Sequence, residues 1–146
     1  MLVVTAIVAV LVIVAGFTVW RWVTPPALSA NASPETVART YFQLDAAGRF
    51  WAAKHLVSRS GRPDIPDGRG YGGSRIIRVG KASPDSKAAY GAWYDAFTQI
   101  CVVTIDYRRT RADDAGDPPG DYSVAVDLGR KTPHGPWRVL YVGSLI

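Results

Sequence analysis

The carboxylates of this chain are its first candidates for chemistry. An aspartate or glutamate acts as a general acid or base when apolar neighbours bury it and raise its pKa. Asp95 fits that requirement best, because Trp93, Tyr94 and Phe97 lie beside it in the sequence. A surface or turn position is the simpler interpretation for this residue and for the other candidates, Asp45, Asp106 and Asp127. We therefore predict no catalytic set and keep Asp95 as the single catalytic candidate.

The histidines, the cysteine and a glycine-rich stretch predict neither a cofactor nor a metal site. His55 and His134 lack clustered cysteine or acidic partners, so neither belongs to a metal motif. Residues 68–73, GRGYGG, match the GxGxxG dinucleotide pattern but follow a loop instead of a strand. With one arginine and one tyrosine, the stretch is also too sparse to predict nucleic-acid binding. Cys101 lies in an apolar run, where we expect a small buried hydrophobe.

Aromatic side chains form a second kind of candidate site. Most of them are expected in the core of a small domain. If the domain has a groove for a ligand or a peptide, four aromatic residues are the ones to examine first. They are Trp51, Trp93, Tyr94 and Trp137.

The N-terminal segment predicts a membrane anchor over residues 1–23. Residues 2–20 carry no charge, and 19 residues in a helix span about 28 Å, close to the hydrocarbon thickness. Trp20, Arg21 and Trp22 follow, as expected where aromatic rings and a cation meet lipid headgroups. A cleaved signal peptide is the alternative, but its apolar region would be shorter and preceded by positive charge. We therefore expect a single-pass protein that contacts the bilayer through residues 2–23.

The residues beyond the anchor predict a short linker and one domain of the α+β class. Residues 24–33 lack charge and apolar periodicity, and we expect them to lift the domain off the bilayer. Apolar spacing in residues 34–146 then predicts two helices followed by a meander of antiparallel strands. The expected helices are 34–47 and 49–58, with one or two turns at 84–90, a long loop at 59–74, and strands at 75–81, 97–109, 122–128 and 137–144.

Composition restricts the class of protein and leaves the meaning of the charge open. Hydrophobic residues make up 48% of 146 residues and are concentrated near the N-terminus, which excludes a polytopic membrane protein and a wholly disordered chain. The single cysteine excludes a disulfide scaffold. The net charge of +5 fits attraction to anionic headgroups or wall polymers, but GC-rich codon usage is the simpler explanation.

The order of elements and two strand phrases resemble the nuclear transport factor 2-like superfamily, also called the cystatin-like α+β cone. The phrases are CVVTIDYRR at 101–109 and GPWRVLYVG at 135–143, and the resemblance covers residues 34–146. More narrowly, the chain resembles membrane-anchored members from high-GC Gram-positive (actinobacterial) organisms, although its anchor is a helix and not a lipidated cysteine. The resemblance implies N-terminal helices across a curved antiparallel sheet. It leaves the activity open, since the scaffold serves isomerases, cyclases, transport receptors and assembly factors of secretion and conjugation.

Two functions follow as expectations. The first is a membrane-anchored binding or assembly module outside the cytoplasm, with protein partners in the cell envelope and no enzymatic activity. The anchor, the short spacer and the lack of a catalytic set favour it, whereas Arg21 and Arg39 would place the domain in the cytoplasm by the positive-inside rule. The second is a small isomerase-like or cyclase-like enzyme, or a lipid or metabolite carrier, that uses the cone pocket with Asp95 as its acid or base.

Overall fold

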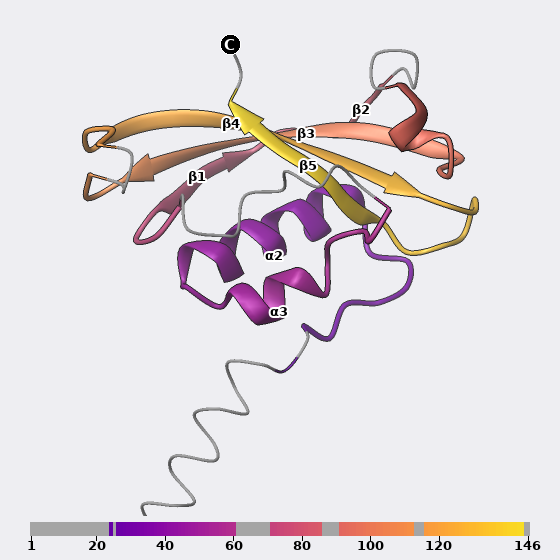
Figure 1. The fold of residues 1–146 in the computed structure, drawn as a ribbon. Helices are drawn as coiled ribbons and strands as arrows, with labels where there is room; N and C mark the ends of the chain where they lie inside the picture. The colour runs from indigo at the N-terminus through magenta and orange to yellow at the C-terminus, as the bar shows by residue number, and fades with distance from the viewer. Residues whose placement is uncertain (1–23, 25, 61–70, 86–90, 113–115, 145–146) are drawn as a thin grey trace, which may run out of the picture.

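The chain folds into a curved antiparallel sheet with two helices packed on one of its faces (Figure 1). The computed structural model describes residues 24, 26–60, 71–85, 91–112 and 116–144. The helices are α2 (Pro34–Ala46) and α3 (Phe50–Lys54). The strands and a single 3-10 turn follow as β1 (Arg75–Val79), β2 (Ser83–Pro84), η2 (Gly91–Tyr94), β3 (Gln99–Arg109), β4 (Gly120–Arg130) and β5 (Arg138–Ser144). This confirms the predicted α+β class.

The β3–β4 hairpin forms the centre of the sheet. The two strands pair along their whole length, from Gln99 opposite Arg130 at one end to Arg109 opposite Gly120 at the other. The strand order is β1-β3-β4-β5, and β2 also pairs with β3. A ladder of this length extends about 35 Å at the rise of a strand residue. The sheet therefore has two well-separated ends.

Helix α2 covers the inner face of the sheet. Ser33 caps it by accepting a hydrogen bond from the backbone N–H of Thr36, and Pro34 occupies the first turn. Its apolar side chains meet those of alternate residues of β3 and β4. The inner core includes Val37, Tyr41, Phe42, Leu44, Val103, Ile105, Tyr107, Val124, Val126 and Leu128.

A second, smaller core, which we call the outer core, lies on the other face of the sheet at the Gln99 end. The sequence did not predict it. Tyr94, Phe97, Ile100 and Leu140 bury one another there. The backbone of Gly129 passes so close beneath them that a Cβ atom would lie 2.7 Å from Leu140 and 2.9 Å from Phe97. Phe97 therefore packs in this cluster, and β3 begins two residues later than predicted.

The edge of β5 is covered by the segment that follows α3. The N–H of Ser58 donates to the carbonyl of Val139 at 2.8 Å, and the N–H of Val139 donates to the carbonyl of Leu56 at 2.9 Å. These bonds explain why the second helix ends at Lys54 instead of reaching residue 58 as predicted. The backbone from Leu56 onward pairs with β5 and is not available for a helix.

Several other boundaries differ from the predictions. Strand β1 ends at Val79, and residues 83–84 pair with β3 where turns of helix were expected; residues 86–90 lie outside the described part. Strand β4 is longer than predicted at both ends. The expected linker does not project freely, because Leu28 and Ala32 pack against the inner core.

Within the part of the chain that the structure describes, no helix is both long enough and apolar enough to cross a bilayer. The predicted span at residues 1–23, with Trp20, Arg21 and Trp22, lies outside the described residues, as does most of the predicted loop, at 61–70.

Candidate functional site

A groove with a basic lining opens between the segment after α3 and the β4–β5 turn. Its volume is about 440 Å³, within the range of sites that hold small ligands. One wall is formed by residues 54–60, and the other by residues 129–138 together with Phe97. The predicted binding residue Trp137 lies within the second of these ranges but is not among the residues that line the groove.

Backbone pairing holds the two walls together. The bonds between Val139 and residues 56 and 58 fix the first wall against β5. Two side-chain bonds add to them: Arg138 donates to the carbonyl of His55 at 3.3 Å, and the Lys131 ammonium donates to Ser60 Oγ at 3.2 Å. The groove is therefore set by the sheet edge, not by a free loop.

The lining is positively charged. Lys54, Arg59, Lys131 and Arg138 contribute cations, and no aspartate or glutamate is among the described residues that line the groove. Among the described residues, none of these four cations forms an ion pair. Hydroxyl groups that can donate further hydrogen bonds also line the walls, from Ser58, Ser60 and Thr132. Guanidinium, ammonium and hydroxyl donors without a competing carboxylate are a chemistry suited to an anion such as phosphate.

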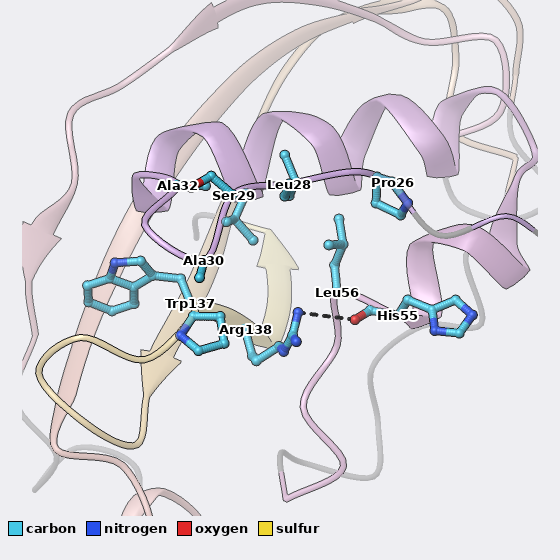
Figure 2. Close-up of a pocket in the computed structure, with 11 residues that line it drawn as sticks. Pro26, Leu28, Ser29, Ala30, Ala32, His55, Leu56, Trp137 and Arg138 are labelled. Carbon is cyan, nitrogen blue, oxygen red and sulfur yellow. Dashed lines mark hydrogen bonds between the residues drawn. The ribbon is translucent and has the colours of Figure 1, made fainter.

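A second cavity, of about 350 Å³, adjoins the groove (Figure 2). The two share His55, Pro136 and Arg138. The segment from Pro26 to Ala32 forms its opposite wall, so the chain enters the domain beside the groove. In Figure 2 the hydrogen bond from Arg138 to the His55 carbonyl crosses this region.

The structure does not gather the four predicted groove aromatics at one place. Trp137 lines the second cavity, where the Arg130 guanidinium lies 4.8 Å from its ring centre. Tyr94 is fully buried in the outer core and donates to Asp127 at 3.5 Å. Trp51 lies on α3 and is 66% exposed. Trp93 belongs to η2, and its side chain lies outside the described part.

Two carboxylates have the burial that acid-base chemistry needs, Asp45 and Asp127, so their predicted surface or turn positions were wrong, whereas Asp95 lacks it. Asp95 is exposed, because it follows η2 on the outer side of the small core. Asp45 is fully buried at the end of α2, and burial raises its pKa to about 6. Its two oxygens accept no hydrogen bond from the described residues, although the backbone N–H of Tyr71 is close enough to oppose the rise in pKa. Its place at a helix end made Asp45 look like a turn residue in the sequence.

Aromatic rings and a buried arginine surround this end of the sheet. Tyr107 stacks on Tyr122 at 5.8 Å and meets Tyr71 edge-on at 5.4 Å. The Arg109 guanidinium lies 4.6 Å from the centre of the Tyr122 ring and pairs with Asp117 at 3.3 Å. Asp45 lines neither the groove nor the adjoining cavity.

The other residues considered in the sequence occupy several different positions, and Cys101 lines a third cavity, of about 450 Å³. Cys101 is buried, which confirms its expected place, and burial raises the pKa of its thiol to about 12. Asp106 accepts from Ser123 and Arg78 on the outer face of the sheet, which holds its pKa below the usual value. His55 borders both cavities through its position after α3. No cluster of metal-ligating side chains occurs among the described residues.

Comparison with known proteins gives no relative for this chain. No protein-family model matches it, and neither a curated protein nor a solved structure does. Its function is therefore inferred from its own residues.

Proposed function

We propose that the chain is a single-pass, membrane-anchored binding module of the cell envelope, with its domain outside the cytoplasm and the basic groove as its anion-binding site. The carrying observation is the groove itself. Within the described part of the chain, two lysines and two arginines line it with no carboxylate, and none of the four forms an ion pair there. A positive cleft of this kind concentrates anions and favours their binding.

The remaining parts of the proposal come from the sequence. The apolar segment 2–20 and its flanking tryptophans support a bilayer anchor. The element order supports the nuclear transport factor 2-like resemblance at the level of two helices on a curved antiparallel sheet. With an anion site and no catalytic set, a binding or assembly role among envelope components fits better than catalysis.

Among the described residues, no carboxylate lines the groove or the adjoining cavity, and the third cavity has Asp85 in its lining but not the candidate Asp95. The acid or base of the enzymatic alternative would have been Asp95, whose side chain is exposed. The buried carboxylates, Asp45 and Asp127, line neither the groove nor the adjoining cavity. A proton-transfer group must reach the substrate directly or through one water molecule. We therefore propose binding and not turnover.

Calorimetry on the full chain in a non-ionic detergent tests the anion site, with inorganic phosphate and glycerol phosphate as probes. We expect binding that weakens with added salt and is lost in the double variant Arg59→Ala/Lys131→Ala. The matched control is Arg75→Ala/Arg111→Ala, which removes two exposed cations near the opposite end of the β3–β4 ladder. Equal loss of binding in both variants would mean that only the net charge of the domain matters and not the groove, which would contradict the proposal.

Protease accessibility tests the side of the membrane. Proteinase added to intact cells or protoplasts is expected to cut the domain, for example in the exposed segment after Leu56. A cytoplasmic control protein should survive in the same sample. A domain that stays intact while a surface control is digested would place it in the cytoplasm.

A further inference from the structure

We propose that the anion recognised by this site is the phosphate of an anionic phospholipid in the same bilayer that holds the anchor. The docking face consists of Trp51, Lys54, Arg59 and Lys131, and we call it the α3 face. This inference rests on the proposed function, since it identifies the ligand of the same groove. It makes the domain a unit that lies on the membrane surface and does not stand away from it.

The chain leaves little distance between the anchor and the α3 face. Trp22, the last aromatic residue of the expected headgroup region, is four residues before Pro26, and four residues span at most about 14 Å. Pro26 is already part of the domain, because it lines the same cavity as His55 and Leu56. Since His55 also lines the groove, the groove lies beside the point where the chain enters the domain.

The packing of the linker strengthens this constraint. A free spacer would let the domain turn in any direction relative to the bilayer. Leu28 and Ala32 instead pack against the inner core, and the N–H of Ala32 donates to the carbonyl of Ser29 at 3.0 Å. The entry point is thus fixed on the helical side of the sheet, and Figure 1 shows the described start of the chain on that side, below α3. The outer face of the sheet is turned the other way.

Trp51 has the properties of a headgroup anchor. It is 66% exposed, which is an unfavourable position in water for so large an apolar side chain. The Lys54 ammonium lies 4.9 Å from its ring centre, so an aromatic ring and a cation are presented together. Tryptophan and lysine side by side are favoured where apolar chains and anionic headgroups meet.

The charges of the outer face differ from those of the α3 face. On the outer face, arginines are matched by aspartates: Arg78 pairs with Asp106, and Arg108 pairs with Asp121, both at 2.6 Å. On the α3 face the cations of the groove have no carboxylate among the lining residues. The outer face also carries the exposed Arg75, opposite Arg108, so an anionic bilayer is attracted more strongly to the α3 face but not to it alone. Free phosphate would use the groove alone, whereas a lipid surface also explains Trp51.

Fluorescence quenching of Trp51 by brominated lipid tests the inference on the full chain. The protein is reconstituted into vesicles of phosphatidylcholine, or of two parts phosphatidylcholine and one part phosphatidylglycerol, with bromine atoms near the headgroup. The signal of Trp51 is the difference between the natural chain and Trp51→Phe. We expect quenching in the anionic vesicles, little in the neutral ones, and loss of quenching at about 1 M salt, where the Debye length falls to about 3 Å.

Charge-reversal variants distinguish an effect of the cations on the α3 face from an effect of the overall net charge. Lys54→Glu/Lys131→Glu should abolish the quenching of Trp51 in anionic vesicles. The control, Arg75→Glu/Arg111→Glu, makes the same change in charge near the other end of the ladder and should leave it intact. Equal effects of the two variants would overturn the inference.

The outcomes distinguish this inference from the proposed function. If glycerol phosphate binds the groove in detergent but Trp51 is not quenched in anionic vesicles, the lipid inference is wrong and the anion-binding site stands. Equal quenching in neutral and anionic vesicles also overturns the inference, because headgroup charge is then not recognised. If neither glycerol phosphate nor anionic vesicles engage the α3 face, both proposals fail.

Discussion

The two ends of the β3–β4 ladder differ in whether their charged side chains are buried and paired or line an open groove. At the Arg109 end, which we call the aromatic end, the arginine is buried against tyrosine rings and paired with Asp117. At the Gln99 end, which we call the groove end, cations collect around an open groove without a carboxylate in its lining. Helix α2 connects the two, with Glu35 at the groove end and Asp45 at the aromatic end.

This difference separates charges that hold the fold from charges that are available to a ligand. A buried charge is retained only when the surrounding groups compensate it, and removing it changes stability. An exposed cation adds little to stability. We therefore expect substitutions at the aromatic end to act on folding and those in the groove to act on binding.

The largest effect is expected for Asp45→Asn. Burial raises the pKa of Asp45 from 3.8 to about 6, so the folded state holds this proton more tightly than the unfolded state does. The natural chain should lose stability as the pH rises from about 4 to about 6, by roughly 2 to 3 kcal/mol. Asparagine has no charge to bury, so the variant should gain stability at neutral pH and lose this pH dependence. Urea denaturation of the full chain in non-ionic detergent, repeated between pH 4 and pH 8, measures both.

Asp95→Asn is the matched control for that experiment, because Asp95 is exposed. It should leave the pH profile of stability unchanged. If Asp45→Asn destabilised the chain at neutral pH, the carboxylate would be compensated in the folded state. The expectation that Asp45 is an uncompensated buried charge at the aromatic end would then be wrong.

The next largest effect is expected for Gly129→Ala at the groove end. The added methyl group would lie 2.7 Å from Leu140 and 2.9 Å from Phe97, both in a fully buried cluster. Overpacking of this kind costs about 1 to 3 kcal/mol. Gly72→Ala is the control, since its Cβ atom would meet nothing within 4 Å. The two variants are compared by their midpoints of urea denaturation. Equal midpoints would mean that the outer core accommodates the added methyl group without loss of stability.

Sequence periodicity was sufficient for the long elements. Helix α2 and the alternation of buried and exposed residues in β3 were predictable, because one face of each meets the inner core over many residues. The outer core was not predictable. Tyr94 and Phe97 cover the second face of the sheet at one end only, a tertiary contact without a periodic pattern.

The groove was missed for a related reason. Its two walls are more than 60 residues apart in the sequence, and they meet only because Leu56 and Ser58 pair with Val139. Spacing along the chain gives no sign of that pairing. A detectable signal was the concentration of lysine, arginine and hydroxyl residues without acids in 54–60. The four predicted groove aromatics could not be sorted from the sequence, because aromatic type alone does not distinguish a core residue such as Tyr94 from an exposed one such as Trp51.

A smaller effect is expected for Glu35→Ala. Glu35 Oε1 accepts from the backbone N–H of Ala82 at 2.8 Å, and this bond lowers the pKa of the carboxyl. The loss should cost about 1 kcal/mol, since the bond is charge-assisted and lies at a helix N-terminus. The contribution of Glu35 should be present above about pH 4.5 and lost below it, opposite in sign to that of Asp45. Glu35→Gln keeps an acceptor and should retain part of the stability, and the same urea series measures both; a pH profile like that of Asp45 would contradict the assignment.

The smallest effect on stability, and the sharpest test of the groove end, is expected for Lys131→Ala. Its ammonium is exposed, donates to Ser60 Oγ at 3.2 Å and lies 5.8 Å from the centre of the Phe97 ring. The free energy of unfolding from urea denaturation should change by less than about 0.5 kcal/mol, because exposed contacts of this kind contribute little. Binding of glycerol phosphate should fall clearly in the same preparation. A loss of stability above 1 kcal/mol with unchanged binding would make Lys131 a structural residue, since its charge would then serve the wall of the groove and not its ligand.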